Sequence, residues 1–347
     1  MKSKLKNLIV AAGAHRLVKR GYGGLGNILM FHRIQSGCAL SPFGASSRGD
    51  VTPEAFAVMI DAIRDEGIEI VSLDKALARL ADPHGSRPFV SLTFDDGYRD
   101  NYDDLWPIVR ELEIPVTIYV TPGFIDRIAP MWWYGLDAVI ARHDRVSLRF
   151  AEGERMVPAR APAEKESAFA GLRQALLTAS AASRATALDS MSERYDIDFL
   201  AIADAAAMTW DMVRELAGSG LVEIGAHTSS HPPLATLSVD DAYAEIRGSK
   251  ERLEEEIGRP VRHFAFPYGD ATTTGLRETE LAARAGFASA TTTRQGALFA
   301  AHSRTPHALP RFPMGADDSP ISLKIKLSGL PVALRRPLRP MVTEPAG

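Results

Sequence analysis

Two carboxylates stand side by side where a buried strand of this 347-residue sequence comes to an end. In "SLTFDDGYRD" (residues 91–100), an apolar and β-branched stretch leads directly into Asp95, Asp96 and Gly97. Neighbouring side chains of a regular strand face opposite ways, but both can reach one pocket where the chain turns. Polar residues at the carboxyl ends of parallel strands line the sites of α/β proteins. Taken alone, such a pair is more typical of a turn or a helix cap.

Two histidines four residues apart follow a second strand end. In "VEIGAHTSSHPPL", the spacing of His227 and His231 lets two imidazoles meet one ion, and Pro232 and Pro233 prevent a helix from continuing. One carboxylate and two histidines form the facial ligand set of a catalytic metal that keeps positions open for water and substrate. Together with Asp96, the two histidines therefore predict a metal site.

A third strand end carries "HFAFPYGD" (residues 263–270). Pro267 fixes the direction of the chain, and Gly269 is expected to leave room for a substrate to approach the backbone. Tyr268 offers either its ring or its amide N–H. Without the other two motifs, this segment would be an ordinary turn.

The elements that must bring these strand ends together alternate along most of the chain. Helical spacing of apolar residues, a capping Thr52 and Pro53 at the first helical position predict a helix at 52–67. The pattern predicts strands at 26–34, 68–73, 88–94, 114–120, 221–226 and 263–268, and further helices at 74–82, 101–113, 209–220, 240–258 and 274–286. Such β-α repetition favours a parallel sheet, open or closed as a barrel, with one helical insertion at about 125–215.

Composition limits the partners and the compartment. The 40 basic and 43 acidic residues nearly cancel, so the overall charge does not indicate a nucleic-acid partner. No apolar run approaches the roughly 18 residues of a spanning helix, and the N-terminal apolar run lacks the features of a secretory signal. A single cysteine, Cys38, excludes an internal disulfide. These features predict a cytoplasmic protein.

Taken in order and with these separations, "TFDDG", "HTSSH" and "FAFPYG" resemble the polysaccharide deacetylases, the NodB-homology group also called carbohydrate esterase family 4. The resemblance covers roughly residues 26–315, between a basic N-terminal segment (1–25) and a basic C-terminal tail (316–347). It implies an α/β fold, a distorted (β/α) barrel of the polysaccharide deacetylase type with a helical insertion. It also implies a divalent metal, most commonly Zn²⁺ with Co²⁺ or Ni²⁺ as alternatives, and removal of acetyl from an N-acetylated sugar polymer or oligosaccharide.

Carried over residue by residue, the resemblance gives each motif a role. Asp95 matches the catalytic base, and Asp96, His227 and His231 match the metal ligands. Tyr268 matches the tyrosine whose backbone N–H helps to hold the oxyanion. The adjacent carboxylates would then do different work on the same water, because Asp96 holds the ion while Asp95 takes the proton.

The sequence departs from the family's commonest pattern in two places. Ala265 stands where many members have an arginine that pairs with the base, and Arg311 is the candidate replacement. No clean match to the late motif with the acid histidine is present. "FAFPYG" is closer to the form found in deacetylases of exopolysaccharide poly-N-acetylglucosamine, whose acid comes from the first strand. That branch points to His32 in "LMFHRI", with His302 and His307 as fallbacks.

Four points remain open at this stage. Trp132 and Trp133 suit stacking on sugar rings, but they suit anchoring of the inserted helices equally well. The motifs act on a carbonyl, so another acyl substrate is an alternative, and the missing arginine keeps a catalytically inactive carbohydrate-binding relative in view. The basic, partly apolar ends predict either peripheral binding to anionic membrane or solvated termini.

Overall fold

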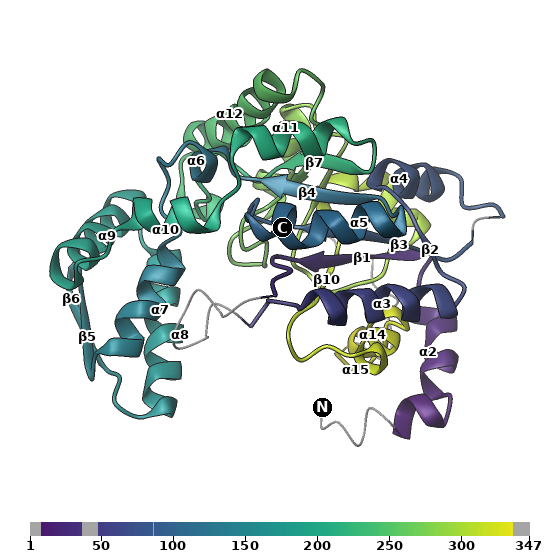
Figure 1. The fold of residues 1–347 in the computed structure, drawn as a ribbon, viewed down its shortest axis with the longest axis horizontal. Helices are drawn as coiled ribbons and strands as arrows, with labels where there is room; N and C mark the ends of the chain where they lie inside the picture. The colour runs from purple at the N-terminus through teal and green to yellow at the C-terminus, as the bar shows by residue number, and fades with distance from the viewer. Residues whose placement is uncertain (1–7, 37–47, 86, 336–347) are drawn as a thin grey trace.

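One parallel sheet organises the chain. The computed structural model describes residues 8–36, 48–85 and 87–335 (Figure 1). The sheet has eight strands in the order β10-β1-β3-β4-β7-β8-β9, and β2 pairs with the beginning of β3. The strands are β1 (Gly26–Phe31), β2 (Glu69–Ile70), β3 (Phe89–Phe94), β4 (Val116–Val120), β7 (Val222–Ala226), β8 (His263–Ala265), β9 (Ser289–Thr291) and β10 (Phe312–Pro313).

The two ends of this sheet are joined through residues 309–313. Leu309 forms a parallel bridge with Thr291 of β9, and β10, three residues further on, pairs with β1. The sheet therefore curls into a ring, which confirms the distorted (β/α) barrel expected from the sequence. The carboxyl ends of the strands gather at one rim because all of these pairings are parallel.

Helices and short helical turns connect the strands and cover the barrel (Figure 1). The helix predicted at 52–67 forms as α3, with the Thr52 hydroxyl accepting a hydrogen bond from the Ala55 N–H at 3.2 Å. The elements outside the insertion are α2 (Ala14–Tyr22), α3 (Pro53–Asp65), α4 (Leu73–Ala81), η1 (Asn101–Leu105), α5 (Trp106–Leu112), α6 (Pro122–Ile125), α11 (Trp210–Gly218), η2 (Leu234–Thr236), α12 (Val239–Ile257), α13 (Leu276–Arg284), η3 (Ala300–Arg304), η4 (Pro306–Ala308), α14 (Pro320–Leu327) and α15 (Leu330–Arg335).

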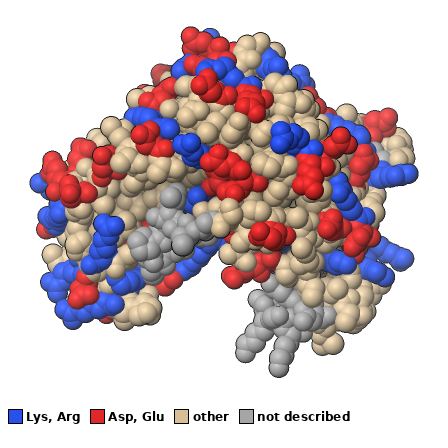
Figure 2. All heavy atoms as spheres, in the orientation of Figure 1, with Lys and Arg blue, Asp and Glu red and all other residues tan. Residues whose placement is uncertain are grey.

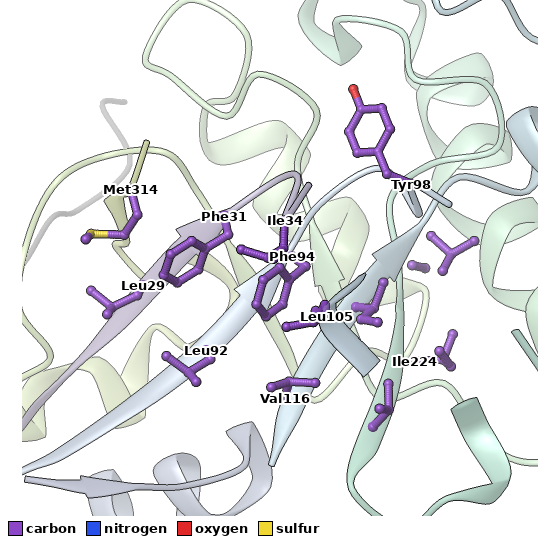
Figure 3. Packing of buried hydrophobic residues seen from close by; sticks show 14 of the residues in the cluster. Leu29, Phe31, Ile34, Leu92, Phe94, Tyr98, Leu105, Val116, Ile224 and Met314 are labelled. Carbon is purple, nitrogen blue, oxygen red and sulfur yellow. The ribbon is translucent and has the colours of Figure 1, made fainter. Parts of the chain in front are cut away.

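The main core lies between the central strands and their covering helices. Figure 3 shows Leu29 and Phe31 of β1 beside Leu92 and Phe94 of β3. The Phe31 and Phe94 rings stack with centroids 5.1 Å apart, and Phe56 of α3 contacts Phe31 edge-on at 5.4 Å. All residues of β1 and β3 are buried, which is why their sequences read as near-continuous apolar runs.

The insertion forms a lobe with a core of its own at one side of the barrel (Figure 1). Its elements are α7 (Trp132–Arg142), β5 (Arg145–Phe150), β6 (Gly153–Pro158), α8 (Pro162–Thr178), α9 (Ala181–Tyr195) and α10 (Phe199–Ala206). The insertion is mostly helical, as expected from sequence, and it also contains the antiparallel hairpin β5-β6, which the sequence reading did not include. Val146, Leu148 and Phe150 alternate toward the lobe core, a period-two pattern that favours a strand.

The basic tail is partly built into the fold. Helices α14 and α15 lie beyond residue 315, yet Leu323, Leu327 and Val332 belong to the main core. Within the described ranges, no helix has the length and apolarity needed to cross a membrane. Acidic and basic side chains are interspersed on the face seen in Figure 2.

Candidate active site

A cavity of about 490 Å³ lies at the carboxyl ends of the strands, where the barrel meets the insertion. Its volume is within the usual range for small-molecule sites. The barrel contributes side chains from the ends of β1, β3, β7 and β8, and the insertion contributes side chains from α7 and α8. The residues discussed below from this lining are His32, Arg33, Asp95, Asp96, Trp132, Trp133, Phe169, Arg173, His227, His231, Tyr268 and Asp270.

Asp96, His227 and His231 converge with the geometry of a metal site. The Asp96 Oδ1 atom lies 3.4 Å from His227 Nε2 and 3.2 Å from His231 Nε2. Two ligands bonded at about 2.0–2.1 Å to one tetrahedral ion lie roughly 3.3 Å apart, so these separations fit a single ion. Asp96 Oδ1 is buried and accepts no hydrogen bond from the described residues. The three side chains therefore fit a divalent cation.

The state of the two imidazoles also suits metal binding. The ring Nδ1 of His227 lies 2.7 Å from the Ala265 carbonyl oxygen, so a proton at Nδ1 leaves Nε2 as a free lone pair facing Asp96. Burial lowers the pKa of His231, although the facing Asp96 carboxylate acts to raise it. A neutral imidazole is the form that binds a metal. Ala265, the position without the usual arginine, thus orients a candidate ligand, His227, through its carbonyl.

The loop that carries both histidines, residues 227–231, is held by contacts with α6. The Gly123 N–H donates to the Ser229 carbonyl at 2.8 Å, and a Cβ on Gly123 would lie 2.5 Å from that oxygen. The Phe124 ring lies 5.7 Å from the His231 ring. Only glycine permits this close approach, because any side chain would collide with the backbone of the histidine loop.

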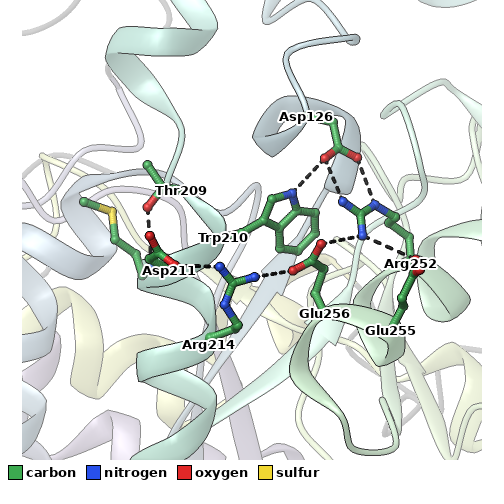
Figure 4. A network of polar contacts seen from close by, with 9 residues as sticks. Asp126, Thr209, Trp210, Asp211, Arg214, Arg252, Glu255 and Glu256 are labelled. Carbon is green, nitrogen blue, oxygen red and sulfur yellow. Dashed lines mark hydrogen bonds and ion pairs between the residues drawn. The ribbon is translucent and has the colours of Figure 1, made fainter.

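A polar network holds α6 in place from the outside (Figure 4). Asp126, just after α6, accepts a hydrogen bond from Trp210 Nε1 at 2.7 Å. Arg252 of α12 contacts both Asp126 carboxylate oxygens, at 3.1 and 3.2 Å, and also pairs with Glu256. The helices α11 and α12 are therefore tied to the turn beneath the histidine loop.

Backbone strain is concentrated in the same three motifs. Non-glycine residues rarely adopt positive φ, and such conformations persist where the surroundings enforce them, often at functional sites. Of the seven in the described ranges, Asp96 (78°), Thr228 (60°), His231 (62°) and Tyr268 (62°) lie in these motifs. This clustering supports the strand ends as the candidate functional site, by an observation that does not involve a metal.

Asp95 is held by Arg311 through two parallel hydrogen bonds. Arg311 Nη1 lies 2.6 Å from Asp95 Oδ1, and Nη2 lies 2.8 Å from Oδ2. The arginine is completely buried and also donates to the Thr93 hydroxyl and the Thr292 carbonyl. Burial raises the pKa of Asp95, but the charge and hydrogen bonds of Arg311, together with other groups around the carboxylate, outweigh burial and hold the pKa below its ordinary value. Asp95 is thereby kept as a carboxylate in a fixed orientation.

The third motif forms a tight turn beside the ligands. The Tyr268 ring lies 4.8 Å from the His231 ring, and no described residue accepts a hydrogen bond from the Tyr268 N–H. Pro267 is buried and its carbonyl accepts a hydrogen bond from the Gly269 N–H at 2.7 Å. A Cβ on Gly269 would lie 2.8 Å from the Thr293 nitrogen. The room expected there for substrate is thus occupied by Thr293, and the glycine serves the turn.

The candidate acid histidines occupy different places. His32 lines the cavity at the end of β1, together with Asp95 and Asp96. His302 is buried and its Nδ1 accepts a hydrogen bond from the Phe299 N–H. His307 Nε2 lies 2.8 Å from the Phe287 carbonyl oxygen. Neither fallback belongs to the cavity lining.

The two tryptophans differ in whether their surroundings favour anchoring of the insertion or stacking on a sugar ring. Trp132 is 4% exposed and packs into the core of the insertion, which favours an anchoring role. Trp133 is half-buried, with its ring 5.2 Å from the His231 ring. Both line the cavity. Trp133 is therefore the one placed with its ring against a candidate ligand.

Two arginines of the cavity were missed by sequence reasoning. Arg33 donates to Asp100 at 2.6 Å, and burial raises the pKa of Asp100 to about 7 although Arg33 opposes it. Arg173 comes from α8 and lines the cavity beside Phe169. The four-residue spacing of Phe169 and Arg173 puts both side chains on one helical face. A lone cation on that face was the feature of the sequence that could have indicated a residue of the cavity.

Comparison with known proteins agrees with the motifs. The polysaccharide deacetylase family model matches residues 82–145 and 184–289. YxkH of Bacillus subtilis (strain 168), a protein named as a polysaccharide deacetylase, is 32% identical over 94 residues, which are 27% of this chain and 30% of YxkH. The chain thus matches about a third of the length of this curated relative.

Three solved structures share the fold. The Streptococcus pyogenes deacetylase PplD in complex with acetate aligns with a TM-score of 0.57 at 19% identity, covering 87% of this chain and 97% of PplD. IcaB from Ammonifex degensii aligns with 0.54 at 17%, covering 87% and 97%. BC0361, a polysaccharide deacetylase from Bacillus cereus, aligns with 0.54 at 15%, covering 87% and 68%. At these identities the similarity concerns the fold.

Proposed function

Because this chain belongs to the polysaccharide deacetylase family, we propose that it is a metal-dependent hydrolase that removes N-acetyl groups from an N-acetylated sugar polymer or oligosaccharide and releases acetate. The proposal is carried by the arrangement of two neighbouring carboxylates. The buried Asp96 Oδ1 lies 3.4 and 3.2 Å from two imidazole nitrogens, and Asp95 is oriented by a buried arginine.

The proposed ligands are Asp96, His227 and His231. A divalent cation bound there, Zn²⁺ first and Co²⁺ or Ni²⁺ as alternatives, would lower the pKa of a water and polarise the acetamide carbonyl. Asp95 accepts the proton of the attacking water, and its ionised state at neutral pH is maintained by Arg311. The bidentate contact also prevents the carboxylate from rotating away from the water.

Two further groups complete the proposed mechanism. The free Tyr268 N–H donates to the oxyanion that forms as the carbonyl carbon becomes tetrahedral. An amide nitrogen leaves poorly unless it is protonated, so a general acid is required, and we assign this role to His32 because it is the one of the three candidate histidines that lines the cavity. Trp133 provides an aromatic face for the sugar ring.

The proposed substrate class, an N-acetylated glycan, follows from the family. The motifs act on a carbonyl, so another N-acyl sugar or a non-sugar amide remains the second candidate. An inactive carbohydrate-binding relative is less favoured, because a scaffold that needed only the metal could dispense with Asp95 and with the arginine that orients it.

Acetate release tests the proposal. Metal-stripped protein is incubated with acetylated chitooligosaccharides and poly-N-acetylglucosamine, with and without Zn²⁺ or Co²⁺. We expect metal-restored release that Asp95→Asn and His32→Ala each reduce by at least about 100-fold, while His84→Ala, an exposed histidine away from the cavity, leaves it unchanged. Release that does not depend on added metal, or that survives Asp95→Asn, would contradict the mechanism.

We also propose that the protein acts in the cytoplasm and associates peripherally with anionic membrane. Leu17 is 73% exposed on α2, next to the exposed Arg16 and close to Arg20. Basic residues near an anionic surface each contribute about 1 kcal/mol of binding. Co-sedimentation with phosphatidylserine vesicles at low salt, weakened by Leu17→Glu, is the expected result. Equal recovery with neutral vesicles would rule the association out.

A further inference from the structure

Arg173 is a cation in the cavity without a carboxylate partner. It is half-buried on α8, and its guanidinium carbon lies 5.6 Å from the centroid of the Tyr268 ring. Among the residues that the structure describes, none forms an ion pair or a hydrogen bond with it. The aromatic face of Tyr268 positions the guanidinium while leaving its five N–H donors available.

The other charged groups of the same cavity are already engaged. Arg33 is paired with Asp100, and Asp95 is paired with Arg311. Asp96 belongs to the candidate metal site, and Asp270 accepts hydrogen bonds from Thr272 and Thr273. In a site whose other charges are largely paired, Arg173 is available to bind an anion of a ligand, since none of the described residues supplies one.

The position of Arg173 relates it to the reacting group. The Tyr268 ring lies 4.8 Å from the His231 ring and 5.6 Å from the Arg173 guanidinium, so Arg173 is at most about 10 Å from a candidate metal ligand. A group at that distance contacts the sugar that carries the acetamide or the sugar next to it.

Arg173 also lies in a part of the chain that the family model does not match. The family model matches residues 82–145 and 184–289, and Arg173 falls in the interval between them. The insertion therefore adds this cation to a site whose reacting groups come from the barrel. A residue supplied from outside the segments that the family model matches is suited to selecting the substrate and not to performing the shared reaction.

We propose that Arg173 binds an anionic group of the glycan, a carboxylate or a phosphate, on the sugar that is deacetylated or on its neighbour. The assignment rests on the proposed deacetylase function and narrows it to acidic N-acetylated glycans. The planar guanidinium matches either anion through two parallel hydrogen bonds.

Three oligosaccharides of equal length test the assignment: one of neutral N-acetylglucosamine, one containing N-acetylmuramic acid as the carboxylate source, and one bearing a phosphate. We expect the wild-type protein to prefer one of the two anionic substrates over the neutral one by about 10- to 100-fold in kcat/KM. Arg173→Gln should abolish this preference through KM, and Arg173→Lys should restore part of it.

Arg155 provides the matched control. It belongs to the same insertion and lies 5.4 Å from the Phe150 ring, but it does not line the cavity. Arg155→Gln should leave the preference unchanged. The proposal is overturned if the wild-type protein treats all three substrates alike, or if Arg173→Gln keeps the preference.

Binding titrations separate this proposal from the deacetylase function. If no substrate yields acetate, the proposed function fails, and titration of the same three oligosaccharides then decides the anion site by itself. Tighter binding of an anionic oligosaccharide that is lost in Arg173→Gln upholds the assignment. Equal binding of all three by the wild-type protein refutes it.

Discussion

Replacement of Arg311 by methionine should reveal how strongly the buried ion pair depends on both partners. Arg311→Met preserves most of the side-chain volume but removes four hydrogen bonds, two of them to Asp95 at 2.6 and 2.8 Å. The side chains of the pair are 0% and 3% exposed, so the remaining carboxylate would be left unpaired away from water. Breaking a buried pair in this way costs about 3–5 kcal/mol.

The double variant distinguishes the ion pair from simple loss of packing. Arg311→Met combined with Asp95→Asn removes both charges. Replacing both members of a buried ion pair by uncharged residues often changes the stability little. The double variant should therefore be more stable than Arg311→Met alone, with a coupling energy of at least about 2 kcal/mol. The coupling energy is measured by urea unfolding of the wild-type protein, both single variants and the double variant. A chelator is present throughout, so that metal occupancy does not differ between the proteins.

An exposed ion pair of the same length provides the control. Arg247 and Glu251 on α12 are also 2.6 Å apart, but each side chain is 56% exposed. Arg247→Met should cost less than about 0.5 kcal/mol because solvent screens the pair. A cost below about 1 kcal/mol for Arg311→Met, similar to that of Arg247→Met, would refute the view that Arg311 holds Asp95 as a buried carboxylate.

Two further outcomes can be measured. Gly123→Ala should destabilise the protein by about 1–3 kcal/mol and weaken Zn²⁺ binding, because its Cβ would lie 2.5 Å from the Ser229 carbonyl oxygen. Gly171→Ala is the control and should have neither effect, because the space around Gly171 is open. Unaltered Zn²⁺ affinity in Gly123→Ala would contradict the view that Gly123 positions the histidine loop. The pKa of His263 is lowered by burial but raised overall by Asp74 and Glu223, so its contribution to stability is fully present below pH 6.5 and is lost as pH rises through the elevated pKa. Urea unfolding of His263→Gln should show a larger deficit at pH 6 than at pH 9, and an equal deficit at both would count against this assignment.

Much of the site could be read from the sequence because each motif is local. "FDDG", "HTSSH" and "FPYG" each follow a strand, and a parallel sheet brings the ends of its strands to one rim whatever their order along the chain. The candidate ligand set and the candidate base beside it required only these three segments. The fold class followed from the alternation of strands and helices for the same reason, since hydrophobic periodicity is written within each element.

Contacts over long sequence separations were decided by the tertiary structure. The bonds between Arg311 and Asp95 span 216 residues and depend on residues 309–313 closing the ring between β9 and β1. The sequence offered Arg311 as a candidate but could not place it. The four-residue spacing of Phe169 and Arg173 placed a lone cation on one helical face, but a single arginine in an alanine-rich helix acquires a role only when the lobe folds against the barrel.

The sequence by itself therefore determined which atoms are the candidates for the chemistry, and the tertiary structure determined what surrounds them. Ligand type and the order of residues at a strand end are local properties. Burial, charge pairing and the unpaired cation depend on how the barrel closes and where the insertion packs, since the free energy of a charge is set by all the groups within several ångströms of it and not by its neighbours in sequence.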